Sequence, residues 1–376
     1  MKVDWSEVPS PCYVLEEEKL LRNLSLMKKV QEEAGVSIIC ALKGFSFYAV
    51  FPTVIQYLSG ATASSLHEAR LVFEKMGAKA HTYCAAYVPQ DFEELQGYSS
   101  HLTFNSLSEY ARWKDRVKSD ISCGLRVNPG YSEIGTELYD PCSPNSRLGI
   151  ARHLLGEELP DGIEGLHFHA LCENDSYTLE KVLKSFTQLY DKFLKKIKWV
   201  NFGGGHLMTR KGYDVGHLIH VLLDFKKQYP NIEQVVLEPG SAVGWQTGYL
   251  RSSVLDLVQN SQTPVAMLDV SFTCHMPDCL EMPYKPQILG AVENGAYEYY
   301  MGGLSCLAGD YMGTWFFDKP LQVGDTVIFD DMIHYTMVKT TTFNGINLPS
   351  IGIWKSDQSF ELLHTYGYSD YATRLS

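Results

Sequence analysis

Short apolar runs alternate with amphipathic segments from about residue 37 to residue 240, and this alternation constrains the fold more than any other feature. An apolar run bounded by turn residues predicts a buried strand, whereas apolar residues at helical spacing predict a helix. Eight strands that alternate with helices predict a parallel sheet, and eight is the number that closes a (β/α)8 TIM barrel; an open doubly wound sheet is the alternative. The predicted strands lie near residues 37–42, 61–65, 81–86, 101–105, 122–129, 162–171, 199–205 and 234–240.

The predicted helices of this region are amphipathic. One runs from about residue 16 to residue 34, with Gly35 as its end. Ser106 and Glu109 have the spacing of a capping box at the start of another. This second helix is predicted at 107–117, and the remaining helices are predicted at 67–76, 177–197 and 215–229.

Beyond about residue 245 the pattern changes to short β-like runs separated by Gly, Pro, Asn and Asp. Such runs, without a long helix between them, are typical of a sandwich or barrel. We therefore expect two domains: a barrel over residues 12–245, and an all-β domain formed by residues 1–11 and 246–376. The β-like runs are Val254–Val258, Pro264–Val270, Glu298–Met301, Thr326–Phe329 and Tyr335–Thr342.

The overall composition excludes several classes of protein. A formal charge of -12 over 376 residues argues against nucleic acid as a partner and suits a cationic substrate. Neither a signal peptide nor an apolar run long enough to span a bilayer is recognisable, so we expect no membrane partner. The nine cysteines include no Cys-x-x-Cys pair, which favours a reducing cytoplasm and argues against a disulfide framework or a structural zinc site.

A lysine stands where the first strand of the predicted barrel ends. The apolar run of residues 36–42 leads directly into Lys43 and Gly44. An ammonium group at the end of a buried strand costs desolvation energy unless it is paired, modified or in reach of water. Such a lysine loses its proton readily and can bond covalently to a carbonyl. A lysine that turns outward to solvent is the alternative.

Two other strand ends complement this lysine, because barrel enzymes carry their chemistry at the carboxyl ends of the strands. Gly203, Gly204 and Gly205 end the seventh strand, and glycines let backbone N–H groups approach an anion closely. Glu238 ends the eighth strand after an apolar run. The alternative for the three glycines is a plain tight turn, and the alternative for Glu238 is a buried salt bridge. A carbonyl for Lys43, a phosphate for the glycines and a basic ring nitrogen for Glu238 together describe pyridoxal 5'-phosphate.

His167 and His169 form a His-x-His pair on the sixth strand. Residues two apart on a strand point to the same face, so the pair could bind a metal, as in some barrel hydrolases. No third ligand with suitable spacing stands out, and we expect a site without metal.

These motifs resemble the alanine-racemase-fold pyridoxal phosphate decarboxylases, which include the ornithine, arginine, diaminopimelate and carboxynorspermidine decarboxylases. The resemblance extends from about residue 10 to residue 345. Each motif is weak alone, but six in the same order are specific. They are Ala41-Leu42-Lys43, Phe168-His169, Gly203-Gly204-Gly205, Glu238-Pro239-Gly240, Cys306-x-x-Gly309-Asp310 and Tyr335.

The resemblance implies a role for each matching residue. Lys43 would hold the cofactor covalently, His169 would stack on its ring, and Arg126 would lie nearby. Glu238 would keep the pyridine nitrogen protonated, where alanine racemase uses an arginine. The phosphate would be held by Gly204, Gly205, Gly240 and Tyr335. Ser241 stands where many relatives have arginine, which puts part of their phosphate contact in doubt.

The resemblance also implies a homodimer with shared active sites. Cys306 would reach the cofactor of the other subunit in a head-to-tail dimer and would be catalytic, together with Lys43 and Glu238. A small buried apolar residue is the alternative for this cysteine. Arg147 matches a basic position that relatives pair with the partner's aspartate, which predicts an ion pair with Asp310 across the dimer.

The substrate is indicated by the residue after Cys306. Ornithine-type enzymes place aspartate there and diaminopimelate enzymes glutamate, but this chain has Leu307. The loop most resembles that of carboxynorspermidine decarboxylase. We therefore expect decarboxylation of carboxynorspermidine or carboxyspermidine, small cationic carboxylated polyamines, in polyamine biosynthesis. Cys306, Asp310 and Asp278 are the candidate substrate contacts, with Glu281 as a weaker one.

Several alternatives stay open at this point. Diaminopimelate, ornithine or arginine could be the substrate instead. An amino-acid racemase is disfavoured by Glu238. A non-catalytic homologue that binds the cofactor, and a metal-dependent hydrolase built on His167 and His169, belong to other classes.

Overall fold

The computed structural model describes residues 3–135, 139–259 and 262–376. The chain divides into two compact units, and each is described by itself. The barrel unit comprises Asn23–Val243, and the β unit comprises Met1–Arg22 and Gly244–Ser376.

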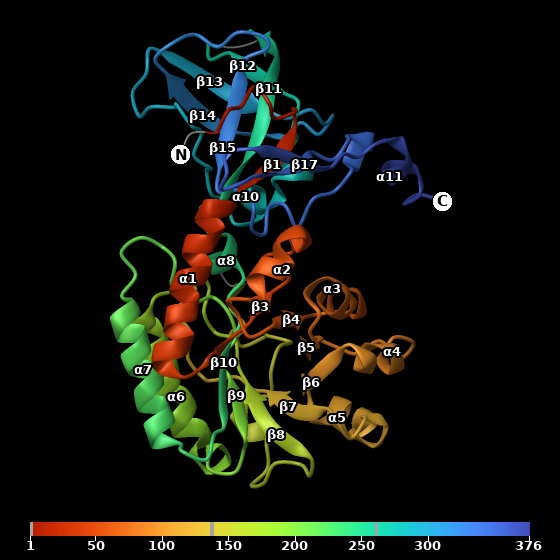
Figure 1. Ribbon diagram of the computed structural model, residues 1–376, viewed down its shortest axis with the longest axis vertical. Helices are drawn as coiled ribbons and strands as arrows, with labels where there is room; N and C mark the ends of the chain where they lie inside the picture. Colours follow the sequence, from red (N-terminus) through yellow and green to blue (C-terminus); the bar gives the residue numbers. More distant parts are fainter. Residues whose placement is uncertain (1–2, 136–138, 260–261) are drawn as a thin grey trace. The chain divides into compact units, whose positions relative to one another are not determined.

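The barrel unit is built on a parallel sheet with the strand order β2-β10-β9-β8-β7-β6-β5-β4-β3 (Figure 1). Only Ile39 separates β2 from β3. Its N–H donates to the carbonyl of Leu237 at 2.9 Å, whereas that of Cys40 donates to Gly60 at 2.9 Å. The split first strand therefore joins the last strand to the second, which closes the (β/α)8 TIM barrel and excludes the open sheet. The strands are β2 (Ser37–Ile38), β3 (Cys40–Ala41), β4 (Ala61–Ala63), β5 (Ala80–Tyr83), β6 (Ser99–Phe104), β7 (Ser122–Arg126), β8 (Ile163–His167), β9 (Trp199–Asn201) and β10 (Gln234–Leu237).

The helices begin where short polar side chains cap them. The hydroxyl of Ser65 accepts a hydrogen bond from Glu68 N at 3.2 Å, and that of Ser106 accepts one from Glu109 N at 3.1 Å. Between β7 and β8 the described residues form no α-helix, and the short 3-10 segment Arg152–Leu154 lies there. The helices are α1 (Glu17–Ala34), α2 (Phe51–Val54), α3 (Leu66–Met76), α4 (Phe92–Gly97), α5 (Leu107–Trp113), α6 (Ser176–Leu194), α7 (Val215–Gln228) and α8 (Ser241–Gly244).

An aromatic layer fills the inside of the barrel. The indole of Trp199 lies against two glycines, because a Cβ on Gly124 or Gly165 would lie only 2.3 Å or 2.0 Å from it. His101 meets this indole edge-on at 5.3 Å, and His81 stacks on His101 at 3.8 Å. Side chains two residues further along β5, β7, β8 and β9 face the same interior, one layer closer to the carboxyl ends. This aromatic layer is therefore the floor of the site described below.

The β unit contains a mixed sheet in the order β14-β13-β12-β11-β1-β16-β17, with β15 paired to β11. The β1 strand pairs with β11 and β16, so Cys12–Glu16 belongs to this sheet, although we expected residues 12–245 in the barrel domain. The strands are β1 (Cys12–Glu16), β11 (Gly248–Val258), β12 (Val265–Leu268), β13 (Tyr297–Gly302), β14 (Tyr311–Phe317), β15 (Thr326–Asp330), β16 (Ser350–Trp354) and β17 (Phe360–His364).

The connections of the β unit contain only short helices: α9 (Phe272–His275), α10 (Pro277–Glu281) and α11 (Tyr368–Ala372). The strand expected at Tyr335–Thr342 is wrong, since the chain there forms turns. Tyr335 has a φ of 41°, which is incompatible with an extended strand. Strands β14, β16 and β17 were not anticipated.

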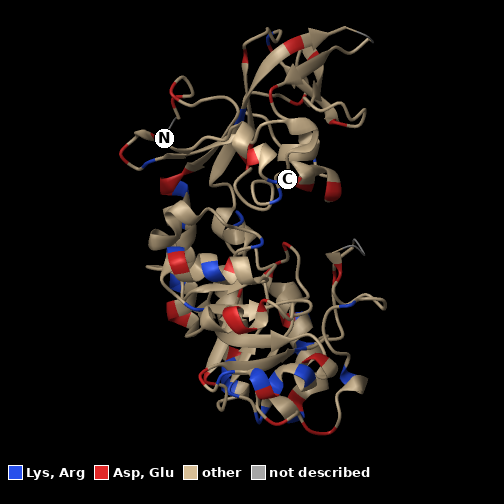
Figure 2. Cartoon of the chain, turned by 90° about the vertical axis from the view of Figure 1, so that its right-hand side faces the viewer, with Lys and Arg blue, Asp and Glu red and all other residues tan. Residues whose placement is uncertain are grey.

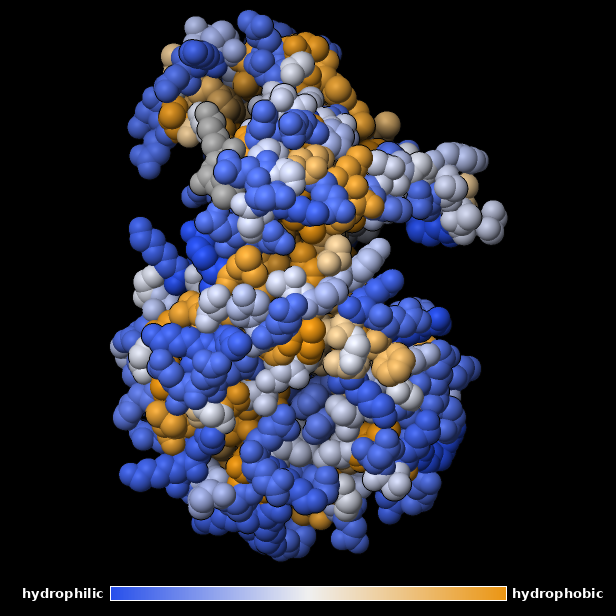
Figure 3. Space-filling view, in the orientation of Figure 1, coloured by the Kyte–Doolittle hydropathy of each residue, from blue (hydrophilic) through white to orange (hydrophobic). Residues whose placement is uncertain are grey.

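The barrel unit carries a hydrophilic outer surface. Near the start of β8 and β9, Lys192 and Lys196 pair with Glu158, and Lys198 pairs with Glu164, so the two signs of charge alternate (Figure 2). Hydrophilic side chains predominate over the helices, with apolar ones scattered between them (Figure 3). Among the described residues, no helix combines the length and the apolar character needed to cross a membrane.

Candidate active site

The carboxyl ends of the barrel strands bring together most of the residues singled out in the sequence. They surround the interior above the aromatic layer, as expected for a TIM barrel. The predicted residues in this group are Lys43, Arg126, His169, Gly204, Gly205, Glu238 and Gly240. The other four, Asp278, Cys306, Asp310 and Tyr335, lie in the β unit.

Lys43 stands in a tight turn directly after β3, where Gly44 N donates to the carbonyl of Ala41 at 3.0 Å. Its side chain is accessible to solvent. Desolvation of the amine by the surrounding protein lowers the pKa of Lys43, although the negative charge of Glu238 acts in the opposite direction. An accessible amine that loses its proton more easily than an ordinary lysine is a good nucleophile toward an aldehyde.

Glu68 acts on the same amine through its charge and was missed by the sequence reasoning. Burial raises the pKa of Glu68, whereas a hydrogen bond from Ser64 N at 2.6 Å and the charge of Lys43 lower it. Its position in the first turn of α3, three residues after the capping serine, gives no hint of this electrostatic interaction.

Glu238 follows β10 and is only 8% exposed. Nε2 of His167 lies 2.9 Å from Oε1 of Glu238, and Nδ2 of Asn201 donates to Oε2 at 3.3 Å. Burial raises the pKa of Glu238, but the contacts with His167 and the charge of Lys43 outweigh it and lower that pKa to about 2. Burial lowers the pKa of His167, so the histidine is neutral and the carboxylate is the charged partner.

His169 is fixed by the glycine loop. Gly204 N donates to Nδ1 of His169 at 2.8 Å, so this nitrogen carries no proton. Burial and the positive charge of Lys43 keep the pKa of His169 well below its ordinary value. The imidazole is therefore neutral and held in one orientation. The Gly204 N–H, which we expected on a phosphate, already has this partner.

The triple glycine lets its loop pack tightly against the neighbouring strand ends. A Cβ on Gly203, Gly204 or Gly205 would lie within 2.6 Å of a backbone oxygen from a neighbouring strand end. The N–H groups of Gly205 and Gly240 donate to none of the described groups. Unpaired backbone donors of this kind suit an anion such as phosphate.

Arg126 ends β7 and is 4% exposed. Its guanidinium lies 4.6 Å from the ring centre of Tyr83, and Nη2 has no hydrogen-bond partner among the described residues. A buried cation with an unused donor calls for an anionic group. Arg126, Lys43 and the glycine N–H groups as donors, with Glu238 as an acceptor, fit pyridoxal phosphate.

The His-x-His pair is used for other contacts, since His167 faces Glu238 and His169 accepts from Gly204. Among the residues that the structure describes, no three His, Cys, Asp or Glu side chains are grouped as a metal site would require.

In the β unit, Cys306 and Asp310 belong to the loop between β13 and β14. The buried carboxylate of Asp310 accepts hydrogen bonds from Thr273 N and Ser305 N, both at 2.9 Å. Burial raises the pKa of Asp310, but these bonds lower it overall. Asp310 therefore fixes the loop that presents the exposed Cys306. The predicted ion pair of Asp310 with Arg147 stays a prediction.

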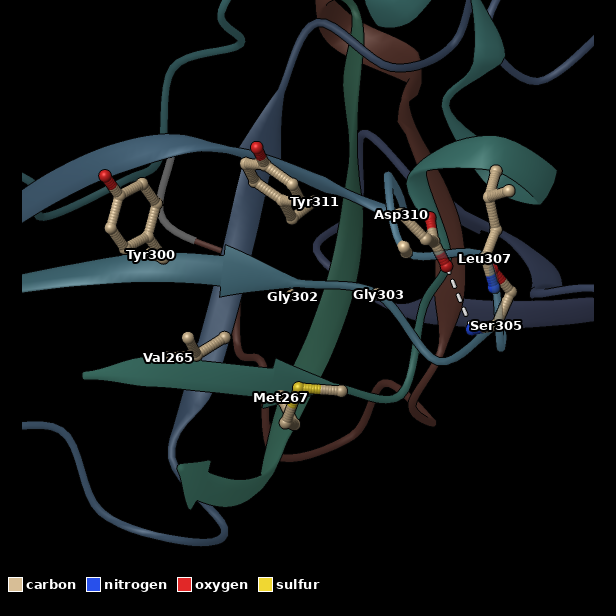
Figure 4. A pocket seen from close by; sticks show the side chains of 10 residues that line it. Val265, Met267, Tyr300, Gly302, Gly303, Ser305, Leu307, Asp310 and Tyr311 are labelled. Carbon is tan, nitrogen blue, oxygen red and sulfur yellow. Dashed lines mark hydrogen bonds between the residues drawn. The ribbon is translucent and has the colours of Figure 1, made fainter. Parts of the chain in front are cut away.

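A cavity lies beside this loop, lined by Leu307, Asp310, Tyr300 and Tyr311 among others (Figure 4). Asp310, Ser305 and Leu307 come from the loop, whereas the two tyrosines come from β13 and β14. The cavity is therefore mixed in character, with one carboxylate beside aromatic and aliphatic side chains.

Asp278 is paired within the β unit. The ammonium of Lys339 lies 2.6 Å from Oδ1 of Asp278 and 2.7 Å from Oε2 of Glu281. The ring of Tyr335 lies 5.8 Å from the same ammonium. Lys339 was missed by the sequence reasoning, because it lies 61 residues from Asp278 along the chain.

Comparisons with known proteins agree with this arrangement. Residues 12–333 match the family described as pyridoxal-dependent decarboxylase, C-terminal sheet domain. A carboxyaminopropylagmatine decarboxylase of Synechocystis is 49% identical over 98% of this chain and 96% of that protein. A carboxynorspermidine/carboxyspermidine decarboxylase of Campylobacter jejuni is 42% identical over 98% of this chain and 99% of that protein.

A solved structure extends the likeness to three dimensions. The crystal structure of carboxynorspermidine decarboxylase from Campylobacter jejuni, complexed with norspermidine, has a TM-score of 0.91 and 40% identity, and it covers 98% of this chain and 100% of that chain. By sequence and by fold, the chain belongs to the pyridoxal-dependent decarboxylases of the ornithine, diaminopimelate and arginine decarboxylase family.

Proposed function

We propose that this enzyme decarboxylates carboxynorspermidine or carboxyspermidine to the corresponding polyamine and CO2. The observation that carries the proposal is the full-length likeness, at a TM-score of 0.91, to a carboxynorspermidine decarboxylase with norspermidine bound. Leu307 supports it, because its exposed aliphatic side chain offers no charge to the distal amine of ornithine or diaminopimelate.

Carboxyaminopropylagmatine is a second candidate substrate, since a relative that is 49% identical is named for it. By its name, that substrate ends in the guanidinium of agmatine, whereas the polyamines end in an ammonium. A planar guanidinium and a compact ammonium need different partner geometry. The two candidates therefore differ at the distal end and share the carboxylate that is lost.

In the proposed reaction, bound pyridoxal phosphate supplies an electron sink for the bond between Cα and the carboxylate. Lys43 would provide the amine that holds the cofactor. Glu238 would stay ionised and hold a proton on the ring nitrogen. His169 would lie against the ring, whereas Arg126, Gly205, Gly240 and Tyr335 would serve the anionic groups.

We further propose a homodimer in which the partner subunit's Cys306 holds a proton at Sγ for transfer to Cα. The homodimer is supported within the β unit by exposed apolar side chains around the Cys306 loop, at Leu304, Leu307 and Tyr311. Exposed apolar groups in one place favour cover by a second surface. All nine cysteines are free, which suits the reducing cytoplasm that we propose as the location.

The test is a product assay with the holoenzyme. Carboxynorspermidine, carboxyspermidine, carboxyaminopropylagmatine, ornithine and diaminopimelate are supplied separately, and CO2 and the amine product are measured. We expect the highest kcat/KM with one of the carboxylated triamines. A higher value with carboxyaminopropylagmatine would favour the second candidate, and a higher value with ornithine or diaminopimelate would contradict both.

A further inference from the structure

Asn201 joins two parts of the site that the proposed reaction needs. Its Oδ1 accepts a hydrogen bond from Gly203 N at 2.8 Å, which leaves the amide nitrogen to face Glu238. The donor Nδ2 then lies 3.3 Å from Oε2 of Glu238. An aspartate at this position would keep the bond to Gly203 but would replace the donor with a second negative charge.

His167 contacts the other oxygen of the same carboxylate. The imidazole is 2% exposed, and its Nε2 lies 2.9 Å from Oε1 of Glu238. Burial lowers the pKa of His167, and the charges of Arg126 and Lys43 lower it further, although Glu238 raises it. Overall, a second proton on His167 is disfavoured. At this distance a neutral ring with its proton on Nε2 can donate to the carboxylate.

Few other groups act on Glu238. The charged or titratable ones that act on it are Lys43 after β3, His81 on β5, His167 on β8 and His206 after β9, and Thr62 on β4 is a further polar contact. A buried carboxylate without donors prefers to bind a proton. Asn201 and His167 each lie within reach of one carboxylate oxygen and can donate to it. They therefore oppose protonation of Glu238. The ring nitrogen of the cofactor would compete with Glu238 for the same proton.

We propose that His167 and Asn201 are positioning residues that keep the shared proton on the ring nitrogen of the cofactor and off the carboxylate of Glu238. This inference rests on the proposed role of Glu238 and adds two residues that act through it. With the proton on the nitrogen, the ring withdraws electrons strongly. With the proton on the carboxylate, the same hydrogen bond exists but the ring is neutral.

The experiment measures the protonation of the ring nitrogen directly. The holoenzyme is loaded with nitrogen-15-labelled pyridoxal phosphate, and the chemical shift of the ring nitrogen is recorded at neutral pH without substrate. We expect a protonated nitrogen in the unchanged enzyme. Asn201→Asp and His167→Leu should each move the resonance toward the unprotonated position. His167→Gln, which restores a neutral donor, should leave it near that of the unchanged enzyme.

Glu238→Gln separates the inference from the function beneath it. This change should move the resonance by itself, and His167→Leu added to it should have no further effect. If Glu238→Gln moves the resonance but Asn201→Asp and His167→Leu do not, the positioning role is wrong. If Glu238→Gln leaves the resonance of the ring nitrogen unchanged, the proposed role of Glu238 itself is wrong. Should Asn201→Asp not fold, the comparison of His167→Leu with His167→Gln decides.

Discussion

Gly44 and Gly240 pack backbone against backbone, since a Cβ added to either would lie 2.9 Å from the Cα of the other. This contact joins the turn that carries Lys43 to the turn that follows Glu238. Ala41 N also donates to the carbonyl of Pro239 at 3.1 Å between the same two turns. The separation of the amine and the acid is thus fixed by two glycines.

Gly240→Ala should disturb both turns, because the added methyl must displace backbone atoms. We expect a loss of about 1–3 kcal/mol in the free energy of unfolding, together with weaker retention of pyridoxal phosphate. Urea unfolding and cofactor titration of the apoenzyme measure the two effects. Gly97→Ala is the control, because a Cβ there meets no atom within 4 Å. Equal behaviour of the two variants would contradict the packing argument.

Lys43→Ala should abolish the absorbance band of the covalently held cofactor and turnover together, because it removes the only amine proposed to bond the aldehyde. Spectra of the reconstituted protein and CO2 release measure both. Lys79→Ala removes an exposed lysine that pairs with Asp120 and should leave both unchanged. Turnover that survived in the Lys43 variant would refute the mechanism.

Lys339→Met should destabilise the β unit, since it leaves the largely buried carboxylate of Asp278 without its cation. The expected loss is about 1–3 kcal/mol in the free energy of unfolding. Lys355→Met removes a more exposed ion pair with Glu361 and should cost about 0–1 kcal/mol. Urea unfolding of both variants gives the comparison, and a smaller loss for Lys339 would contradict it.

The pH dependence of that loss follows from Lys339. Burial lowers the pKa of Lys339, but its bonds to Asp278 and Glu281 raise it above the ordinary value of 10.5 overall. Its contribution to stability is therefore fully present below the ordinary value and is lost as the pH rises through the raised one. The difference between Lys339→Met and the unchanged protein should shrink only at strongly alkaline pH.

His101→Phe should make the barrel unit more resistant to acid. Burial lowers the pKa of His101 from 6.5 to about 4, so between these values the unfolded chain binds a proton that the folded chain does not. Stability then falls as the pH drops below 6.5. Between neutrality and about pH 5, the free energy of unfolding should fall by about 2 kcal/mol less in the variant than in the unchanged protein. Urea midpoints at both pH values measure this, with the exposed His220→Gln as control; an equal fall in His101→Phe would contradict the assignment.

The sequence by itself determined the architecture of the barrel and the chemistry at its strand ends. Each of the eight predicted strands has an observed counterpart, and the predicted helix at Val215 begins there. Such elements are readable because the spacing of apolar residues and the capping side chains are local. Lys43 and Glu238 were recognisable for the same reason, since each ends an apolar run.

Only the tertiary structure decided which side chains meet. The partners of Glu238 come from two other strands, and Asp278 finds Lys339 across 61 residues. Strand β1 joins the β unit because its partners β11 and β16 lie hundreds of residues further along the chain. Periodicity tells which face of a strand is inside, but not which strands are neighbours or which residues lie level with one another. That register places the donors that keep Glu238 charged, and it exists only once the barrel has closed.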